Sequence, residues 1–258
     1  MGKLFDVSIV FSSIPKLLRY LPVSLEITMI SMLFGLFLGL LFAAVRIKRI
    51  PVLRTIAAFF VSFIRGTPLI VQLYISYYVI PLILKYINFR YGTAYSLKSV
   101  PDMLFVIIAF SFNEAAYNSE ILRAALLSVQ KGQIEAAESL GMSGFQVFRR
   151  VILPQASVVA IPPLGNAFIG LLKGTSLAFV AGVIEMTAAG RIISGNNFRF
   201  FEVYLALAIV YWALTILIER LATFLEKRVS IPEQVSEGAA KPKKGNNSFL
   251  FFSGGDRT

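Results

Sequence analysis

The chain has 258 residues, of which 57% are hydrophobic and only 15% are charged, whereas a soluble globular protein carries about 25% charged residues. It contains no cysteine and no histidine, which excludes disulfides, thiolate metal sites and histidine catalysis, so no catalytic or metal-binding residue is expected. The net charge of +11 falls mainly between apolar stretches, a pattern that favours loops beside anionic lipid and argues against nucleic acid as a partner.

The apolar stretches predict an all-α integral membrane protein with about five transmembrane helices. Residues 8–20 are expected to form a short amphipathic helix on the outer surface. A spanning helix needs about 20 mostly apolar residues, and such stretches lie at 22–45, 60–84, 103–125, 156–174 and 202–224. The first span carries Gly35 and Gly39, a spacing typical of closely packed helices.

Two segments do not fit this pattern of spans. Residues 174–199 begin with an apolar stretch too short to cross a bilayer, which predicts a re-entrant or packed segment covered by protein. Residues 231–258 are rich in Gly, Lys, Ser and Asn, which predicts a mobile cytoplasmic tail after a transmembrane domain over 1–230.

The basic residues predict the orientation of the spans. Residues 46–54 hold four positive charges and no acid, and further basic pairs lie at 149–150 and 227–228. With five spans these three places share one side, which the positive-inside rule makes cytoplasmic. The N-terminus and residues 86–100 are therefore expected outside, and the C-terminus inside.

The longest polar segment between spans, at 128–154, is predicted to form two short helices. The first covers about 132–140 and ends at Gly141. The second begins at Ser143, with Gln146 at the spacing of a capping box. Pro154 is expected to keep the second helix from fusing with the next span. A compact helical hairpin of this kind is typical of a protein-docking element.

The same segment resembles the EAA loop of ABC-importer permeases. The match consists of Glu135-Ala136-Ala137, Gly141 three residues later, and Val151-x-Leu153-Pro154 after nine more, with Val151 where isoleucine is usual. The stretches at 65–72, 116–123 and 173–177 resemble the polar amino-acid branch of these permeases. The resemblance extends over roughly residues 15–230 in one order.

The resemblance implies a type I ABC importer-like permease subunit in a bacterial cell membrane. It would carry polar amino acids, possibly cystine, and would not itself be an enzyme. Because no G-x-x-x-x-G-K-[ST] motif occurs, ATP and Mg are expected on a separate ATPase chain and no cofactor on this one. The other implied partners are a second permease copy or a sister permease, an extracytoplasmic substrate-binding protein and membrane lipid. The residues implied in coupling to the ATPase are Glu135, Ala136, Ala137, Gly141, Leu153 and Pro154.

Polar groups within the spans are candidates for the substrate pathway, because such groups face the bundle interior. A mid-membrane site is predicted between the start of the second span and the middle of the third. A helix N-terminus at Thr67 and Pro68 would bind a carboxylate there, and Glu114 would bind an ammonium group. The alternatives are an internal hydrogen-bond network, an ion pair of Glu120 with Arg123, and Lys173 extending to an interface. The candidates are Thr67, Asn113, Glu114, Tyr117, Asn118, Glu120 and Lys173.

Two other function classes compete with an ABC permease. A secondary transporter would use Glu114 and Glu120 as an ion relay, but five spans without an internal repeat do not suit its common designs. A membrane enzyme is disfavoured by the missing histidine and cysteine. The exact substrate stays open between cystine, arginine, glutamine and histidine, as does the choice between a homodimer and a heterodimer.

Overall fold

The structure is a computed structural model that describes residues 4–96 and 100–229. All the regular elements of these residues are helical, and the tail expected at 231–258 lies outside them. In chain order the elements are α1 (Val7–Leu18), α2 (Leu21–Ile47), α3 (Leu53–Arg65), α4 (Leu69–Tyr91), α5 (Asp102–Leu127), α6 (Lys131–Ser139), α7 (Gly144–Val147), the π-helical turn η2 (Phe148–Ile152), α8 (Leu153–Gly174), the 3-10 helix η3 (Thr175–Ala181), α9 (Met186–Asn197) and α10 (Phe200–Val229).

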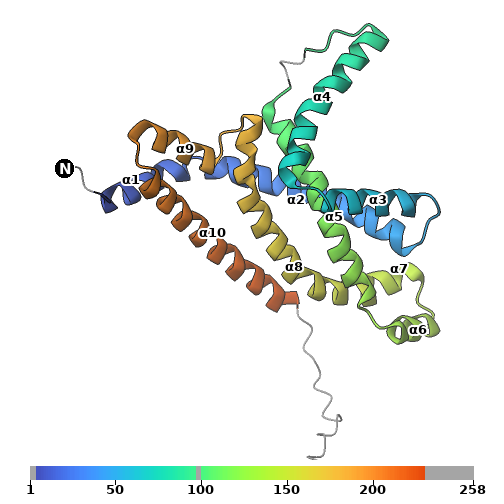
Figure 1. Cartoon of the computed structure of the whole chain (residues 1–258). Helices are drawn as coiled ribbons and strands as arrows, with labels where there is room; N and C mark the ends of the chain where they lie inside the picture. The colour runs from blue at the N-terminus through green and yellow to red at the C-terminus, as the bar shows by residue number, and fades with distance from the viewer. Residues whose placement is uncertain (1–3, 97–99, 230–258) are drawn as a thin grey trace, which may run out of the picture.

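The structure confirms the all-α membrane fold. Four helical segments of the described residues are long and apolar enough to cross a bilayer, at Leu21–Ile47, Leu69–Tyr91, Gly144–Ala181 and Phe200–Arg228. The third predicted span, 103–125, forms the single helix α5 at the centre of the bundle, where α2, α3, α4 and α8 all pack against it (Figure 1). Its polar residues keep the mean hydropathy of α5 below that of the other four.

The two glycines of α2 explain its close contact with α5. A Cβ at Gly39 would lie 3.0 Å from the backbone nitrogen of Ser119, and a Cβ at Gly35 would overlap the Cβ of Glu114. Only glycine lets the two backbones approach this closely. The spacing of Gly35 and Gly39 was therefore a correct signal for helix packing.

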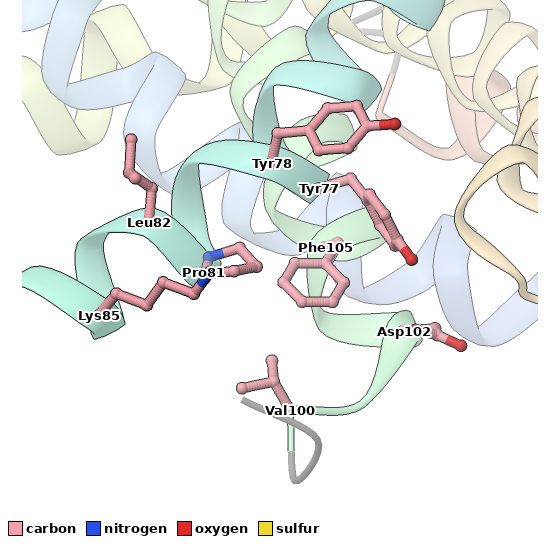
Figure 2. Close-up of a pocket in the computed structure, with 8 residues that line it drawn as sticks. All are labelled: Tyr77, Tyr78, Pro81, Leu82, Lys85, Val100, Asp102 and Phe105. Carbon is pink, nitrogen blue, oxygen red and sulfur yellow. The ribbon is translucent and has the colours of Figure 1, made fainter. Parts of the chain in front are cut away.

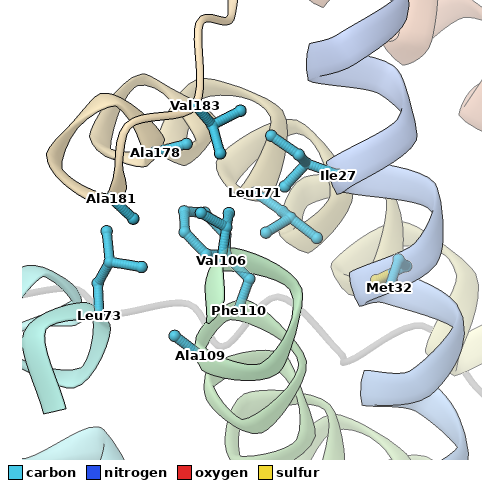
Figure 3. Packing of buried hydrophobic residues seen from close by; sticks show 10 residues of the cluster. All are labelled: Ile27, Met32, Leu73, Val106, Ala109, Phe110, Leu171, Ala178, Ala181 and Val183. Carbon is cyan, nitrogen blue, oxygen red and sulfur yellow. The ribbon is translucent and has the colours of Figure 1, made fainter. Parts of the chain in front are cut away.

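A buried apolar cluster joins α2, α4, α5, α8 and η3 (Figure 3). Phe110 of α5 lies at its centre with no exposed surface, and Ala178 and Ala181 of η3 complete it. The start of the segment 174–199 is therefore packed against protein, which agrees with the expected packed segment. The cluster consists of Ile27, Met32, Leu73, Val106, Ala109, Phe110, Leu171, Ala178, Ala181 and Val183.

The second span, predicted at 60–84, consists of two helices and a break between them. The chain breaks between Arg65, which ends α3, and Leu69, which begins α4. Pro68 lacks the N–H of a helical residue and disfavours a helical Thr67 before it. The N-cap of α4 is Pro68 without a side-chain cap, whereas the Thr67 hydroxyl donates to the Phe63 carbonyl at 3.0 Å. The helix start predicted at Thr67 and Pro68 is therefore present, with Pro68 as the N-cap in place of Thr67.

The expected break at Pro154 is wrong. The helix runs without interruption from Gly144 to Ala181. Between α7 and α8 it widens into η2, where the Leu153 N–H donates to the carbonyl of Phe148, five residues earlier. This wider turn relieves the crowding between the proline ring and the preceding turn, so Pro154 is accommodated inside the helix.

Candidate functional site

A cavity of about 490 Å³ opens where the break before α4 faces the middle of α5 and the second half of α8. It brings together four of the predicted pathway residues: Thr67, Asn113, Glu114 and Tyr117. We call it the Glu114 cavity. Its lining consists of Thr67, Pro68, Leu69, Asn113, Glu114, Tyr117, Ile121, Pro163, Ala167, Gly170, Leu171 and Gly174.

Glu114 is the acidic group of this cavity and is 6% exposed. The side-chain amide of Asn118 donates to its carboxylate at 3.3 Å. Within residues 4–96 and 100–229, no lysine or arginine lies within ion-pair distance of Glu114. A buried carboxylate is stable as an anion only with a compensating charge. The cavity therefore offers a site for a cationic group.

The first turn of α4 supplies the opposite polarity. The N–H groups of Val71 and Gln72 both donate to the Pro68 carbonyl, at 3.0 and 3.2 Å. The N–H groups of Leu69 and Ile70 precede them and have no acceptor within the helix. Leu69 lines the cavity, so the positive end of the α4 dipole lies at its wall, where an anionic group is favoured.

Gln72 holds this geometry and was not among the predicted site residues. Its side-chain nitrogen donates to the Ile64 carbonyl at 2.7 Å and to the Thr67 carbonyl at 3.0 Å. Its side-chain oxygen accepts from Asn113 at 2.9 Å. The residue thus ties the broken helix to α5. A lone glutamine in an otherwise apolar stretch was the available signal.

Glu120 lies outside the Glu114 cavity and is held by two arginines. Arg123 binds its carboxylate at 2.9 Å, as the i,i+3 spacing predicted, and Arg46 at the end of α2 binds it too. Arg46 and Glu120 line a second cavity of about 400 Å³, which we call the Arg65 cavity. Tyr117 is shared by both cavities.

The structure separates two further candidates from the cavities. Asn118 is completely buried beside Met32 of α2, so it reaches the Glu114 cavity only through its hydrogen bond to Glu114. Lys173 is exposed in the last turn of α8 and lines neither cavity. This position agrees with the alternative that Lys173 extends to an interface.

The loop at 128–154 forms the two expected helices, α6 and α7. Gly141 ends α6 with a left-handed φ of +79°. The Gly141 N–H donates to Glu138 and the Met142 N–H to Ala137, the bonds of a Schellman motif. Ser143 and Gln146 form the predicted capping box. Both helices follow the C-terminal end of α5, away from α1 and α9 (Figure 1).

Of the predicted coupling residues, five are exposed or partly exposed and one is buried. Ala137 of α6 is 6% exposed, and Val147 of α7 is buried too. Leu140 and Phe145 are 80% and 72% exposed beside Gly141. An apolar surface of this kind on a polar loop is typical of a protein contact. The exposed or partly exposed coupling residues are Glu135, Ala136, Gly141, Leu153 and Pro154.

A third opening, of about 500 Å³, lies between α4 and the start of α5, at the opposite end of α5 from α6 (Figure 2). Its wall is aromatic, and the rings of Tyr77 and Phe105 meet edge to face at 5.3 Å. Lys85 and Asp102 bring one charge of each sign to its lining. None of the predicted pathway residues lies in it.

Comparison with known proteins identifies the family. Residues 35–231 match the family described as "Binding-protein-dependent transport system inner membrane component". The chain belongs to this family. It is therefore a multi-pass membrane permease of an ABC importer, as the EAA-like loop predicted.

Curated relatives place this permease in the polar amino-acid branch. It is 43% identical to the L-cystine transport system permease protein TcyL of Bacillus subtilis (strain 168), over 89% of this chain and 93% of the relative. It is 43% identical to the probable amino-acid permease protein YxeN of the same organism, over 88% and 97%. The glutamine transport system permease protein GlnP of Escherichia coli (strain K12) is 34% identical, over 88% and 99%.

A solved structure supports the same placement of the permease. The crystal structure of an amino acid ABC transporter with histidines matches at a TM-score of 0.72 and 31% identity, covering 87% of this chain and 99% of that chain. An inward-facing conformation of the MetNI methionine ABC transporter matches at a TM-score of 0.61 and 21% identity, over 83% and 96%. The second likeness shows the shared type I importer fold alone.

Proposed function

We propose that this permease conducts a polar amino acid into the cell through the Glu114 cavity, with energy from ATP hydrolysed on a partner chain. The observation that carries the proposal is the pairing of the Glu114 carboxylate with the first turn of α4 in one cavity. The names of the relatives support an amino acid as the cargo, with cystine and glutamine among them.

The two polar groups of the cavity match the two charges of an amino acid. The ammonium group pairs with the Glu114 carboxylate, for which the described residues provide no cation. The carboxylate meets the N–H groups at Leu69 and Ile70, where the helix dipole is positive. Binding at both ends supplies the compensation that a buried charge requires.

The partners follow from the loop and from the family. The exposed surface around Gly141 docks into an ATPase subunit, which holds ATP and Mg, while a second permease copy or a sister permease completes the pathway. A substrate-binding protein delivers the amino acid from outside. The basic residues at 46–54 and 149–150 support a cytoplasmic side for this loop and the C-terminus, with the N-terminus outside.

The test is the substrate-stimulated ATPase activity of the reconstituted complex over a panel of amino acids that includes L-cystine and L-glutamine. Glu114→Gln removes the charge of Glu114 and keeps its shape. We expect the variant to raise KM about tenfold or more, as when one charge-assisted hydrogen bond is lost, while basal ATPase activity survives. If KM and selectivity are unchanged, Glu114 is structural and the proposed site is wrong.

A further inference from the structure

The Arg65 cavity lies directly beyond the Glu114 cavity along α5. Tyr117 and Glu120 follow Glu114 by three and six residues, so Glu120 is about 9 Å closer to the α6 end of the helix. A solute that leaves Glu114 toward α6 meets Tyr117 first. The lining consists of Arg46, Ala58, Val61, Ser62, Arg65, Gly66, Tyr117 and Glu120.

This second cavity has the opposite charge to the first. The carboxylate of Glu120 is bound by Arg46 and Arg123. Arg65 lies over the Tyr117 ring, 5.5 Å from its centre, and no carboxylate of residues 4–96 and 100–229 lies within ion-pair distance of it. The lining of the cavity therefore holds two arginines and one glutamate, an excess of one positive charge that favours an anion.

We propose that the Arg65 cavity is a second subsite, occupied during release, in which Arg65 binds the carboxylate of the amino acid that has left Glu114. This inference rests on the proposed function. The guanidinium group suits the role because its planar donors match both oxygens of a carboxylate. The cavity volume of about 400 Å³ is close to that of the Glu114 cavity, about 490 Å³, so it holds the same solute.

Tyr117 acts as the partition between the two subsites. Tyr117 is 42% exposed and lines both cavities, and Arg65 is positioned over its ring. A charge-assisted hydrogen bond is stronger than a partly exposed cation–π contact. A carboxylate that reaches Arg65 therefore displaces the ring. The Tyr117 ring moves aside only for a solute that carries a negative charge.

The experiment compares Arg65→Gln with wild type in the reconstituted complex, with Arg54→Gln as control. Arg54 lies on the same helix α3, is exposed and does not line the cavity. The probes are the best-transported amino acid of the panel and its α-carboxamide, which lacks the carboxylate charge.

We expect Arg65→Gln to lower kcat for the amino acid about tenfold, which corresponds to the loss of one charge-assisted hydrogen bond. KM should be unchanged. Arg65→Lys should restore most of kcat.

The carboxamide distinguishes binding from a structural role of Arg65. If Arg65 binds the carboxylate, wild type turns over the carboxamide slowly and Arg65→Gln slows it no further. An equal slowing of both probes would mean that Arg65 only holds Tyr117, and an unchanged kcat would also overturn the second subsite. A raised KM with normal kcat would assign Arg65 to the first site. The effect of Glu114→Gln on KM tests the proposed function separately, whatever the result for Arg65.

Discussion

Glu114 owes its position to two glycines on the neighbouring helix. Gly35 and Gly39 let α2 approach α5 so closely that any side chain at either position would meet Glu114 or Ser119. Asn118 fills the same contact and donates to the Glu114 carboxylate. The orientation of the acidic group in the cavity therefore depends on residues that never touch the solute.

Gly39→Leu tests this dependence at the residue scale. The added side chain would enter the space of the Ser119 backbone, 3.0 Å from the new Cβ. Overpacking of this kind costs about 1–3 kcal/mol of stability, so we expect a lower Tm of the purified permease in detergent. Gly195→Ala on α9 is the control, because a Cβ there meets nothing within 4 Å. An equal Tm for wild type and Gly39→Leu would show that α2 and α5 are not packed as described.

At the scale of elements, the sequence predicted the helix ends that are formed by hydrogen bonds between near neighbours. The capping box at Ser143 and the turn at Gly141 are formed by neighbours within a few residues, and both were predicted correctly. The π turn that accommodates Pro154 departs from the usual behaviour of proline, which interrupts a helix. The bond from Gln72 to Asn113 joins residues 41 positions apart. The continuous helix was missed because proline usually ends one, and the role of Gln72 was missed because a lone glutamine does not indicate its distant partner.

The hairpin of α6 and α7 gives a prediction at the same scale. Gly141→Asp places a side chain in the left-handed region at φ +79° and adds a negative charge to the exposed surface beside Leu140 and Phe145. We expect the variant to remain in the membrane at wild-type levels but to lose uptake and co-purification with the ATPase subunit. Gly132→Ala, in α6 with nothing within 4 Å of the new Cβ, should retain both. Normal uptake by Gly141→Asp would refute the docking role.

At the scale of the whole molecule, the broken second span decides the architecture. Pro68 stops α3 and starts α4, and Figure 1 shows α4 extending away from the other helices. The break places a helix N-terminus against the middle of α5, which a continuous span at 60–84 would not do. The sequence predicted that Thr67, Pro68 and Glu114 share one site, and the packing of α4, α5 and α8 brings them to one cavity.

The orientation of the molecule is tested by cysteine labelling, because the native chain contains no cysteine. Single cysteines at positions 50 and 240 should react only after the membrane is made permeable, and a cysteine at position 93 should react in intact cells. The reason is the excess of positive charge at 46–54, which is retained on the cytoplasmic side. Labelling of position 240 from outside would refute the arrangement of five spans.

The most direct test of the central claim is amino-acid uptake by the reconstituted complex when the ATP site of its ATPase subunit is disabled. The account predicts that uptake of the preferred amino acid is lost, although the complex still assembles, because no residue motif of this chain binds a nucleotide. A proton or sodium gradient imposed on the disabled complex should not restore uptake. Uptake driven by such a gradient would contradict the account and identify Glu114 and Glu120 as parts of an ion relay instead.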